Sequence, residues 1–452
     1  MPLILGTNSI KDTGYDVANS VRLEAAYMKR TVTPSTSNTW TLSFWLKKSG
    51  HNGSSEGYLF SYGADGGQGF YISAAGYLGY YGASGYSSDS TLSQGVLRDV
   101  SSWSHICFSV SSGTGTLYIN GVQDATISNV APLNATTGNT YAVNSYINYE
   151  ANFDNFLGYM AEYVFIDGTA YDQNSFGEFD SDSPNIWKPI DVSELTFGTN
   201  GFYLDFEDSS DLGKDVSGNS NHFTTTGLTA TDQSTDTCTN NFATLNSLLD
   251  VNATPTFSEG NLVFQGTGST NFVGATIPVS SGKWYVEVKA TTVNGSYPII
   301  GVIDSQSYKR RDSTYFVGSD IDTSNPSGFA VFSNGDIYHN ADNNFSNLTT
   351  TYTSGDIIGM ALNMDASPNT LGFYKNGALE VTINLDTAPS GAYMFSSAIH
   401  SSTSSAKGEF NFGNPTFSIS SGNTDANGYG NFEYSVPSGY YALNSKNLAE
   451  YG

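Results

Sequence analysis

The chain has 452 residues, enough for two or three domains, and its 17 Lys and Arg against 42 Asp and Glu give a formal net charge of −25 at pH 7. So negative a field repels phosphate backbones and anionic headgroups, which excludes nucleic acid and membrane surfaces as expected partners. Only 13% of residues are charged, whereas glycine (48), tyrosine (30) and phenylalanine (27) are abundant, so neither a helix-rich nor a disordered chain is expected.

Targeting and cross-linking signals are weak in this sequence. The opening MPLILGTNSIKD has a short apolar stretch with no basic residue before it, so no secretory signal is expected. The sequence contains no run of about 18 apolar residues, so no membrane span is predicted. Cys107 and Cys238 are too few for a disulfide framework and lack the spacing of a zinc site, and Cys107 is expected to be a buried, unreactive residue.

Short alternating segments rich in Val, Ile, Thr, Tyr and Phe, separated by Gly, Asn, Asp and Ser, predict an all-β protein built from antiparallel sandwiches. In WTLSFWL, residues 40–46, every second residue is apolar, which predicts one buried strand face. Residues 101–110 alternate in the same way, with Ile106, Phe108 and Val110 on one face and Cys107 on the other.

The segment GFYISAAGYLGYYGASGY, residues 69–86, offers the best binding signal, because aromatic rings pack on the apolar faces of sugars. We expect one group of its side chains in the core: Phe70, Ile72, Tyr77 and Leu78. The other group, Tyr80, Tyr81 and Tyr86, is expected at the surface, where the rings contact either a ligand or another subunit.

Two distant segments share one turn signal. Residues 116–127 and 370–383 each place Asn-Gly between two strand-like stretches, at Asn120-Gly121 and Asn376-Gly377. Asn and Gly tolerate positive φ angles, as a tight two-residue hairpin requires. The two hairpins therefore predict the same position in two similarly built domains.

The sequence lacks the residue patterns of the common hydrolase and nucleotide-binding sites. In glucan hydrolases of the sandwich type, alternate carboxylates on one strand supply a nucleophile and an acid. The nearest segment is YLDFE, residues 203–207, but Tyr203 stands where the first carboxylate is needed, beside Asp205 and Glu207. The five histidines are scattered, and no serine elbow or phosphate-binding loop is present. The protein is therefore not expected to be an enzyme.

Three segments resemble the concanavalin A-like jelly roll of the laminin G and pentraxin-like group, in the same order and spacing: residues 40–50 (WTLSFWLKKSG), 101–123 and 157–171. Further along, residues 280–292 (SSGKWYVEVKATT), 298–306 and 354–377 resemble a SPRY domain, which is another two-sheet sandwich. The resemblance implies two sandwich domains, and composition places them at residues 1–225 and 260–452, with a closing strand of the first at residues 201–207. Residues 226–259 are expected to be a polar, locally packed linker, and residues 422–452 a final strand or an arm that docks on a neighbour.

Residues 5–24, 215–248 and 436–448 resemble segments of tail and virion-surface proteins of tailed bacteriophages. This resemblance implies a virion structural protein that is assembled in the host cytoplasm, in a tail fibre or tail-associated appendage that contributes to attachment to surface glycan. A capsid decoration or head-fibre protein is the alternative, and a glycan depolymerase is disfavoured by the missing acid pair. Expected partners are other virion proteins and further copies of the chain, with a trimer favoured.

Two more candidate sites follow from these resemblances and from charge. Laminin G-like domains often bind calcium at one rim, and the candidate ligands are Asp154, Glu162 and Asp167. No other cofactor is expected. In the second domain, Tyr308, Lys309, Arg310 and Arg311 form the one compact basic segment of the sequence, which suits an anionic sugar or an acidic subunit, or is a solvated loop.

Overall fold

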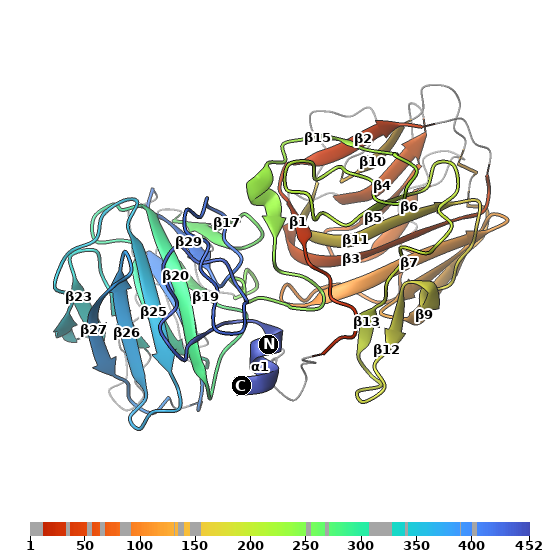
Figure 1. Ribbon diagram of the computed structural model, residues 1–452. Coiled ribbons are helices and arrows are strands. Elements are labelled where there is room, and N and C mark those ends of the chain that lie inside the picture. Colours follow the sequence, from red (N-terminus) through yellow and green to blue (C-terminus); the bar gives the residue numbers. More distant parts are fainter. Residues whose placement is uncertain are drawn as a thin grey trace. The chain divides into compact units, whose positions relative to one another are not determined.

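The computed structural model divides into two compact domains, Thr13–Asn240 and Asn241–Gly452. It describes residues 12–32, 37–51, 57–63, 68–81, 92–130, 132–133, 140–144, 155–249, 255–266, 271–306, 328–339, 342–388, 390–399 and 405–452. Figure 1 shows the strands of each domain in two stacked layers. The predicted all-β class and the antiparallel sandwich architecture are confirmed.

The first domain packs an eight-stranded sheet on a six-stranded sheet. The larger sheet has the order β16 (Gln233–Ser234), β1 (Ser20–Leu23), β11 (Phe156–Asp167), β3 (Trp40–His51), β7 (Trp103–Ser111), β8 (Thr114–Ile119) and β9 (Val122–Ile127), with β14 (Phe202–Leu204) paired to β11. The smaller sheet has the order β15 (Thr224–Thr226), β2 (Tyr27–Thr31), β10 (Thr140–Val143), β4 (Gly57–Gly63), β5 (Gln68–Ile72) and β6 (Leu78–Tyr81). A short ribbon of β12 (Gly177–Phe179) and β13 (Trp187–Pro189) and two 3₁₀ turns, Gln173–Ser175 and Ala230–Asp232, complete the described elements.

The second domain repeats this plan. Its larger sheet has the order β17 (Thr256–Ser258), β18 (Val263–Gln265), β29 (Lys407–Asn411), β20 (Lys283–Thr292), β25 (Ile357–Asn363), β26 (Thr370–Lys375) and β27 (Ala378–Asn384), with β30 (Tyr441–Ala442) paired to β20. Its smaller sheet has the order β19 (Asn271–Gly274), β28 (Tyr393–Ile399), β21 (Ile299–Asp304), β22 (Gly328–Val331), β23 (Asp336–His339) and β24 (Asp342–Asn347).

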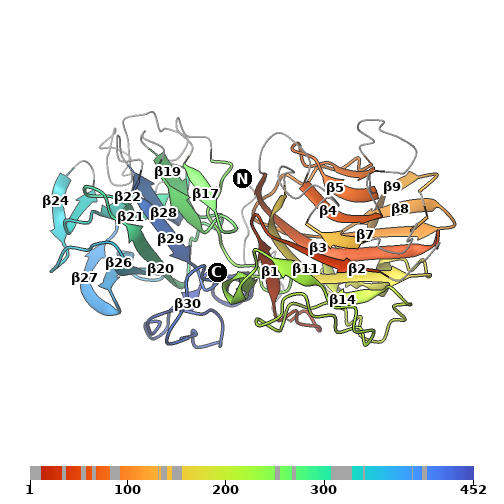
Figure 2. The ribbon, with the colours of Figure 1, turned by 90° about the horizontal axis from the view of Figure 1, so that it is seen from above.

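The two domains share one topology. The path β1-β11-β3-β7-β8-β9 has the same chain order as β18-β29-β20-β25-β26-β27, and β2-β10-β4-β5-β6 has the same order as β19-β28-β21-β22-β23. In Figure 2, β3, β7, β8 and β9 follow one another across the larger sheet of the first domain. Among the described strands of these four sheets, β17, β24 and β30 of the second domain and β14, β15 and β16 of the first lie outside these matched paths. The predicted similarity of the two domains is therefore present in the strand order of both sheets.

The two Asn-Gly hairpins occupy equivalent positions, as predicted. Each joins the last two strands of the larger sheet, and all four turn residues have positive φ angles. The Asn120 side-chain oxygen accepts a hydrogen bond from the backbone of His105 at 2.7 Å, and that of Asn376 accepts one from Ile357 at 2.9 Å. In both domains the asparagine therefore ties the turn to a third strand, so the turn is held by more than its own two strands.

Gly121 is expected to be much less tolerant of alanine than Gly168, although both have positive φ angles. A Cβ atom at Gly121 would lie 2.2 Å from the Trp187 ring, whereas one at Gly168 would meet no atom within 4 Å. We expect Gly121→Ala to cost about 1 to 3 kcal/mol more than Gly168→Ala, through overpacking. Chemical denaturation of both variants measures the difference, and equal losses would contradict the packing argument.

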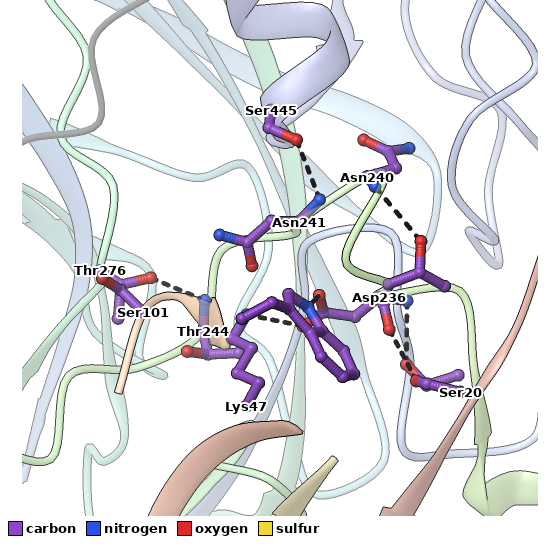
Figure 3. Close-up of polar contacts among 12 residues, drawn as sticks. Ser20, Lys47, Ser101, Asp236, Asn240, Asn241, Thr244, Thr276 and Ser445 are labelled. Atoms are coloured by element: carbon purple, nitrogen blue, oxygen red, sulfur yellow. Dashed lines mark hydrogen bonds and ion pairs between the residues drawn. The ribbon is translucent and has the colours of Figure 1, made fainter. Parts of the chain in front are cut away.

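The boundary between the domains is sharper than the predicted linker of residues 226–259. Gln233 and Ser234 pair with β1 in the first domain, and Asp236 binds Lys47 of the same domain at 2.7 Å. Leu245 already lies in the core of the second domain. Figure 3 shows this segment, with Asp236 directed at Lys47. The described residues of the predicted linker are therefore packed locally, those up to Asn240 in the first domain and those from Asn241 in the second.

The C-terminal segment packs on its own domain. The final strand β30 pairs in parallel with β20, which confirms the predicted strand, and helix α1 (Ser445–Tyr451) follows it. Tyr441 stacks on Tyr451 with ring centroids 3.9 Å apart. Contact of these residues with a neighbouring subunit remains a prediction. No helix in the described part of the chain is long and apolar enough to cross a membrane.

Candidate functional site

A row of three tyrosines crosses neighbouring strands on the outer face of the smaller sheet of the first domain. Tyr58 on β4 lies opposite Tyr71 on β5, with ring centroids 5.9 Å apart, and Tyr71 is 6.3 Å from Tyr81 on β6. We call Tyr58, Tyr71 and Tyr81 the tyrosine row. Tyr58 and Tyr71 are buried, and Tyr81 is partly exposed. The row therefore ends in one ring that an outside molecule can reach.

Glycines on the same strands make room for this row. A Cβ atom at Gly79 would lie 2.2 Å from the Tyr71 ring, and one at Gly69 would lie 3.0 Å from the Tyr58 ring. Tyr71 pairs with Gly79, and Tyr81 pairs with Gly69. The alternation of glycine and tyrosine after residue 68 is the sequence signal that could have located Tyr71 and Tyr81 together.

The structure corrects one member of the predicted aromatic surface. Tyr80 is 3% exposed, and its hydroxyl lies 2.6 Å from that of Tyr62 inside the core. Successive residues of a strand face opposite sides, so Tyr80 and Tyr81 cannot share a surface. The prediction of a surface position is wrong for Tyr80, whereas Tyr86 lies outside the described residues. Of the predicted core residues, Phe70, Ile72 and Leu78 are buried there, and Tyr77 is only partly buried.

The prediction for the basic segment of the second domain cannot be compared with the structure. Tyr308, Lys309, Arg310 and Arg311 lie outside the described residues. The described chain before this segment ends at Gln306, which donates its backbone N–H to Asp304 at 2.9 Å. The proposed role of the basic segment in binding an anionic sugar or an acidic subunit remains a prediction.

Glu162 forms an unusual buried site on the outer face of the larger sheet of the first domain. It lies at an irregularity between β11 and β3 and has a φ angle of 50°. The same carboxylate oxygen accepts hydrogen bonds from the hydroxyls of Tyr203, at 2.8 Å, and Tyr15, at 3.2 Å. Burial raises the pKa of Glu162 to about 7, and the charges of Asp205 and Glu207 act in the same direction.

The Glu162 site places a carboxylate beside Tyr203, the YLDFE residue that stands where a hydrolase would need its first carboxylate. Tyr203 does stand where a carboxylate was sought, and Glu162 from β11 approaches it from 41 residues away in the sequence. Glu162 is 6% exposed and is bound by two tyrosines, so it is held as part of the packed layer over the sheet. No local pattern pointed to this contact, because its members come from three separate segments.

The two described calcium candidates, Glu162 and Asp167, each have other hydrogen-bond partners. Asp167, at the end of β11, accepts hydrogen bonds from the backbone and side-chain N–H groups of Asn200, both at 3.1 Å. Glu162 lies five residues before Asp167 on the same strand, and its carboxylate accepts hydrogen bonds from two tyrosines. Asp154 lies outside the described residues. Within the described ranges, no group of three or more His, Cys, Asp or Glu side chains is placed to hold a metal ion. Calcium binding near Asp154, Glu162 and Asp167 remains a prediction.

Ser43 and His105 form a buried pair with the residue types of a catalytic dyad, but the histidine nitrogen that faces Ser43 carries a proton and cannot act as a base. Ser43 Oγ lies 2.9 Å from Nε2 of His105, and the Trp187 indole N–H donates to Nδ1 at 3.1 Å. Because an indole nitrogen can only donate, Nδ1 carries the lone pair and Nε2 the proton. Burial also lowers the pKa of His105 to about 3. The imidazole therefore cannot take a proton from Ser43, and this pair is structural.

Comparison with known proteins identifies the class of the first domain. Residues 23–173, about a third of the chain, match the model of the concanavalin A-like lectin/glucanases superfamily. This match and the two stacked sheets make the first domain similar to the concanavalin A-like sandwiches. No curated protein sequence matches the chain significantly.

Several solved structures are similar to parts of the chain. The SPRY domain of human HERC1 is 20% identical with a TM-score of 0.27, covering 33% of this chain and 87% of the other. A candidate carbohydrate-binding protein from Bacteroides ovatus is 16% identical with a TM-score of 0.35, covering 48% and 60%. Domain 4 of AbnA, a GH43 extracellular arabinanase from Geobacillus stearothermophilus that was solved with arabinotriose, is 18% identical with a TM-score of 0.28, covering 34% and 72%.

Proposed function

We propose that the protein is a non-catalytic carbohydrate-binding protein and that Tyr81, at the reachable end of the tyrosine row, contacts the sugar. The tyrosine row is the observation that carries the proposal. A tyrosine ring packs on the C–H face of a sugar, and its hydroxyl can hydrogen-bond the sugar edge. The concanavalin A-like fold of residues 23–173 supports a binding role for this domain.

The proposed setting is the virion of a tailed bacteriophage, in a tail fibre or tail-associated appendage that attaches to host surface glycan. Resemblance of residues 5–24, 215–248 and 436–448 to phage virion proteins supports this setting, and so do two rigid sandwiches in one chain. A capsid decoration or head-fibre protein is the second candidate. In either position the partners would be other virion proteins and further copies of this chain, with a trimer favoured.

Antibody labelling of purified virions tests the setting. Gold-labelled antibody against the chain should decorate the tail or its appendages in electron micrographs, and the same antibody should block adsorption to host cells. Label on the head would favour the decoration protein instead. Virions without label would contradict a virion role of either kind.

Incubation with host surface polysaccharide tests the non-catalytic part of the proposal. We expect no release of reducing ends, because Glu162 is buried under tyrosines and YLDFE lacks a nucleophile. The double variant Asp205→Ala, Glu207→Ala should give the same product profile as the wild type. Release of reducing ends that disappears in the double variant would show an enzyme.

A further inference from the structure

Lys47 and Asp236 form a completely buried pair in the first domain. Lys47 lies on β3 and is 1% exposed, Asp236 follows β16 and is 0% exposed, and Lys47 Nζ lies 2.7 Å from Asp236 Oδ2. The other carboxylate oxygen, Oδ1, accepts a hydrogen bond from the Trp103 indole N–H at 2.9 Å. The ring of Tyr159 lies 5.8 Å from Nζ. The indole of Trp103 and the ring of Tyr159 thus lie beside an amine and a carboxyl group in contact.

Burial favours the neutral forms of both groups. Withdrawal of an ammonium and a carboxylate from water costs several kcal/mol per ion, so proton transfer within the pair becomes accessible. Burial is also the main cause that lowers the pKa of Lys47, against the opposing effect of Asp236. Proton transfer leaves a neutral amine beside a carboxylic acid. These are the two reactants of an amide condensation, held together at high effective concentration.

We propose that Lys47 and Asp236 join spontaneously in an intramolecular amide bond. The Lys47 ammonium gives one proton to Oδ2, and the Nζ lone pair then attacks Cγ of Asp236. A second proton passes from Nζ to Oδ2, the Cγ–Oδ2 bond breaks, and Oδ2 leaves as water. The product is an Nζ–Cγ amide, formed without an oxidant, a reductant or any co-reactant. This inference is independent of the proposed glycan binding.

Trp103 and Asp99 have distinct roles in this step. Negative charge develops on Oδ1 during the attack, and the Trp103 N–H already points at that oxygen. The charge of Asp99 raises the pKa of Lys47 and so opposes the first proton transfer. The Asp99 carboxylate is positioned by Ser101, which donates to it from its backbone N–H and its hydroxyl at 2.8 and 2.6 Å.

The bond would fasten the end of the first domain to its sheet. It links residues 189 positions apart, and Asp236 lies four residues before the domain boundary. Closing so long a loop removes entropy from the unfolded chain and stabilises the folded domain. Tension applied along the chain would then meet a covalent bond at this end of the domain.

Mass spectrometry of the intact, denatured wild-type protein tests the bond without any variant. We expect a mass about 18 Da below that of the sequence, after allowance for the initiator methionine, since one water is lost in the modification. Trypsin should then release residues 31–48 joined to residues 215–283, because a modified Lys47 is not cleaved. The full sequence mass, with a free peptide of residues 31–47, would overturn the proposal.

Matched lysine variants locate the reaction. Lys47→Met should restore the full mass, whereas Lys48→Met, at the next position, should keep the loss of water. Trp103→Phe should slow the reaction by about 100-fold, through loss of the donor to Oδ1, and leave a mixture of both masses in freshly made protein. A loss of water that persists in Lys47→Met would place the dehydration elsewhere and overturn the proposal.

Discussion

Replacement of Glu287 with alanine is expected to destabilise the second domain by about 4 kcal/mol, because buried donors lose their acceptor. Glu287 is 0% exposed and accepts hydrogen bonds from the backbone N–H groups of Glu433 and Tyr434, at 3.0 and 2.9 Å, and from the Asn411 amide at 3.2 Å. It thereby holds the C-terminal segment on β20. Chemical denaturation measures the loss, and hydrogen exchange should rise first in residues 423–434.

Glu433→Ala provides the matched control for this prediction. Its carboxylate accepts hydrogen bonds from Ser420 near the surface, so its removal should cost about 1 kcal/mol or less. Equal losses for the two variants would show that Glu287 does not hold the C-terminal segment in the way described.

Replacement of Glu162 with glutamine is expected to remove a pH dependence of stability. The ordinary pKa of this carboxyl is 4.5, and burial raises it to about 7 in the folded protein. The folded state therefore binds a proton more tightly than the unfolded state. The free energy of unfolding should fall by about 3 kcal/mol as the pH rises from 4.5 to 7, and stay lower above that.

Glu162→Gln should lack this fall, since the glutamine oxygen still accepts from the tyrosines but never ionises. Denaturation curves at several pH values, compared with the wild type, measure the difference. Glu207→Gln, at an exposed position nearby, should keep most of the fall, because burial and not the Glu207 charge is the main cause of the raised pKa of Glu162. A parallel pH dependence in wild type and Glu162→Gln would contradict the raised pKa.

Local sequence pattern was sufficient for the strands and the hairpins. Alternation at residues 40–46 and 101–110 placed Phe44, Ile106 and Phe108 in the core, and Cys107 on the opposite face. The Asn-Gly turns require positive φ angles wherever they occur, so their hairpins could be located without knowledge of the rest of the chain. These features depend on neighbours in the sequence.

Features that depend on distant residues could not be predicted. The carboxylate of Glu162 meets Tyr15, which is 147 residues away, and Lys47 meets Asp236 across 189 residues. The exact domain boundary, between Asn240 and Asn241 inside the predicted linker, could not be predicted for the same reason, because the polar stretch after residue 225 contacts side chains far from it in the sequence. Tyr80 was assigned to the surface face of its strand although it lies on the core face, because LGYY contains two adjacent tyrosines and adjacent residues of a strand lie on opposite faces.

Binding of host surface polysaccharide to the immobilised full-length protein tests the central claim most directly. The wild type should bind, and Tyr81→Ala should weaken binding by about 10-fold, the equivalent of one aromatic contact. Tyr27→Ala, on β2 near the other edge of the same sheet, is the control and should bind like the wild type. Absence of binding by the wild type, or equal binding by Tyr81→Ala, would contradict glycan recognition at the tyrosine row.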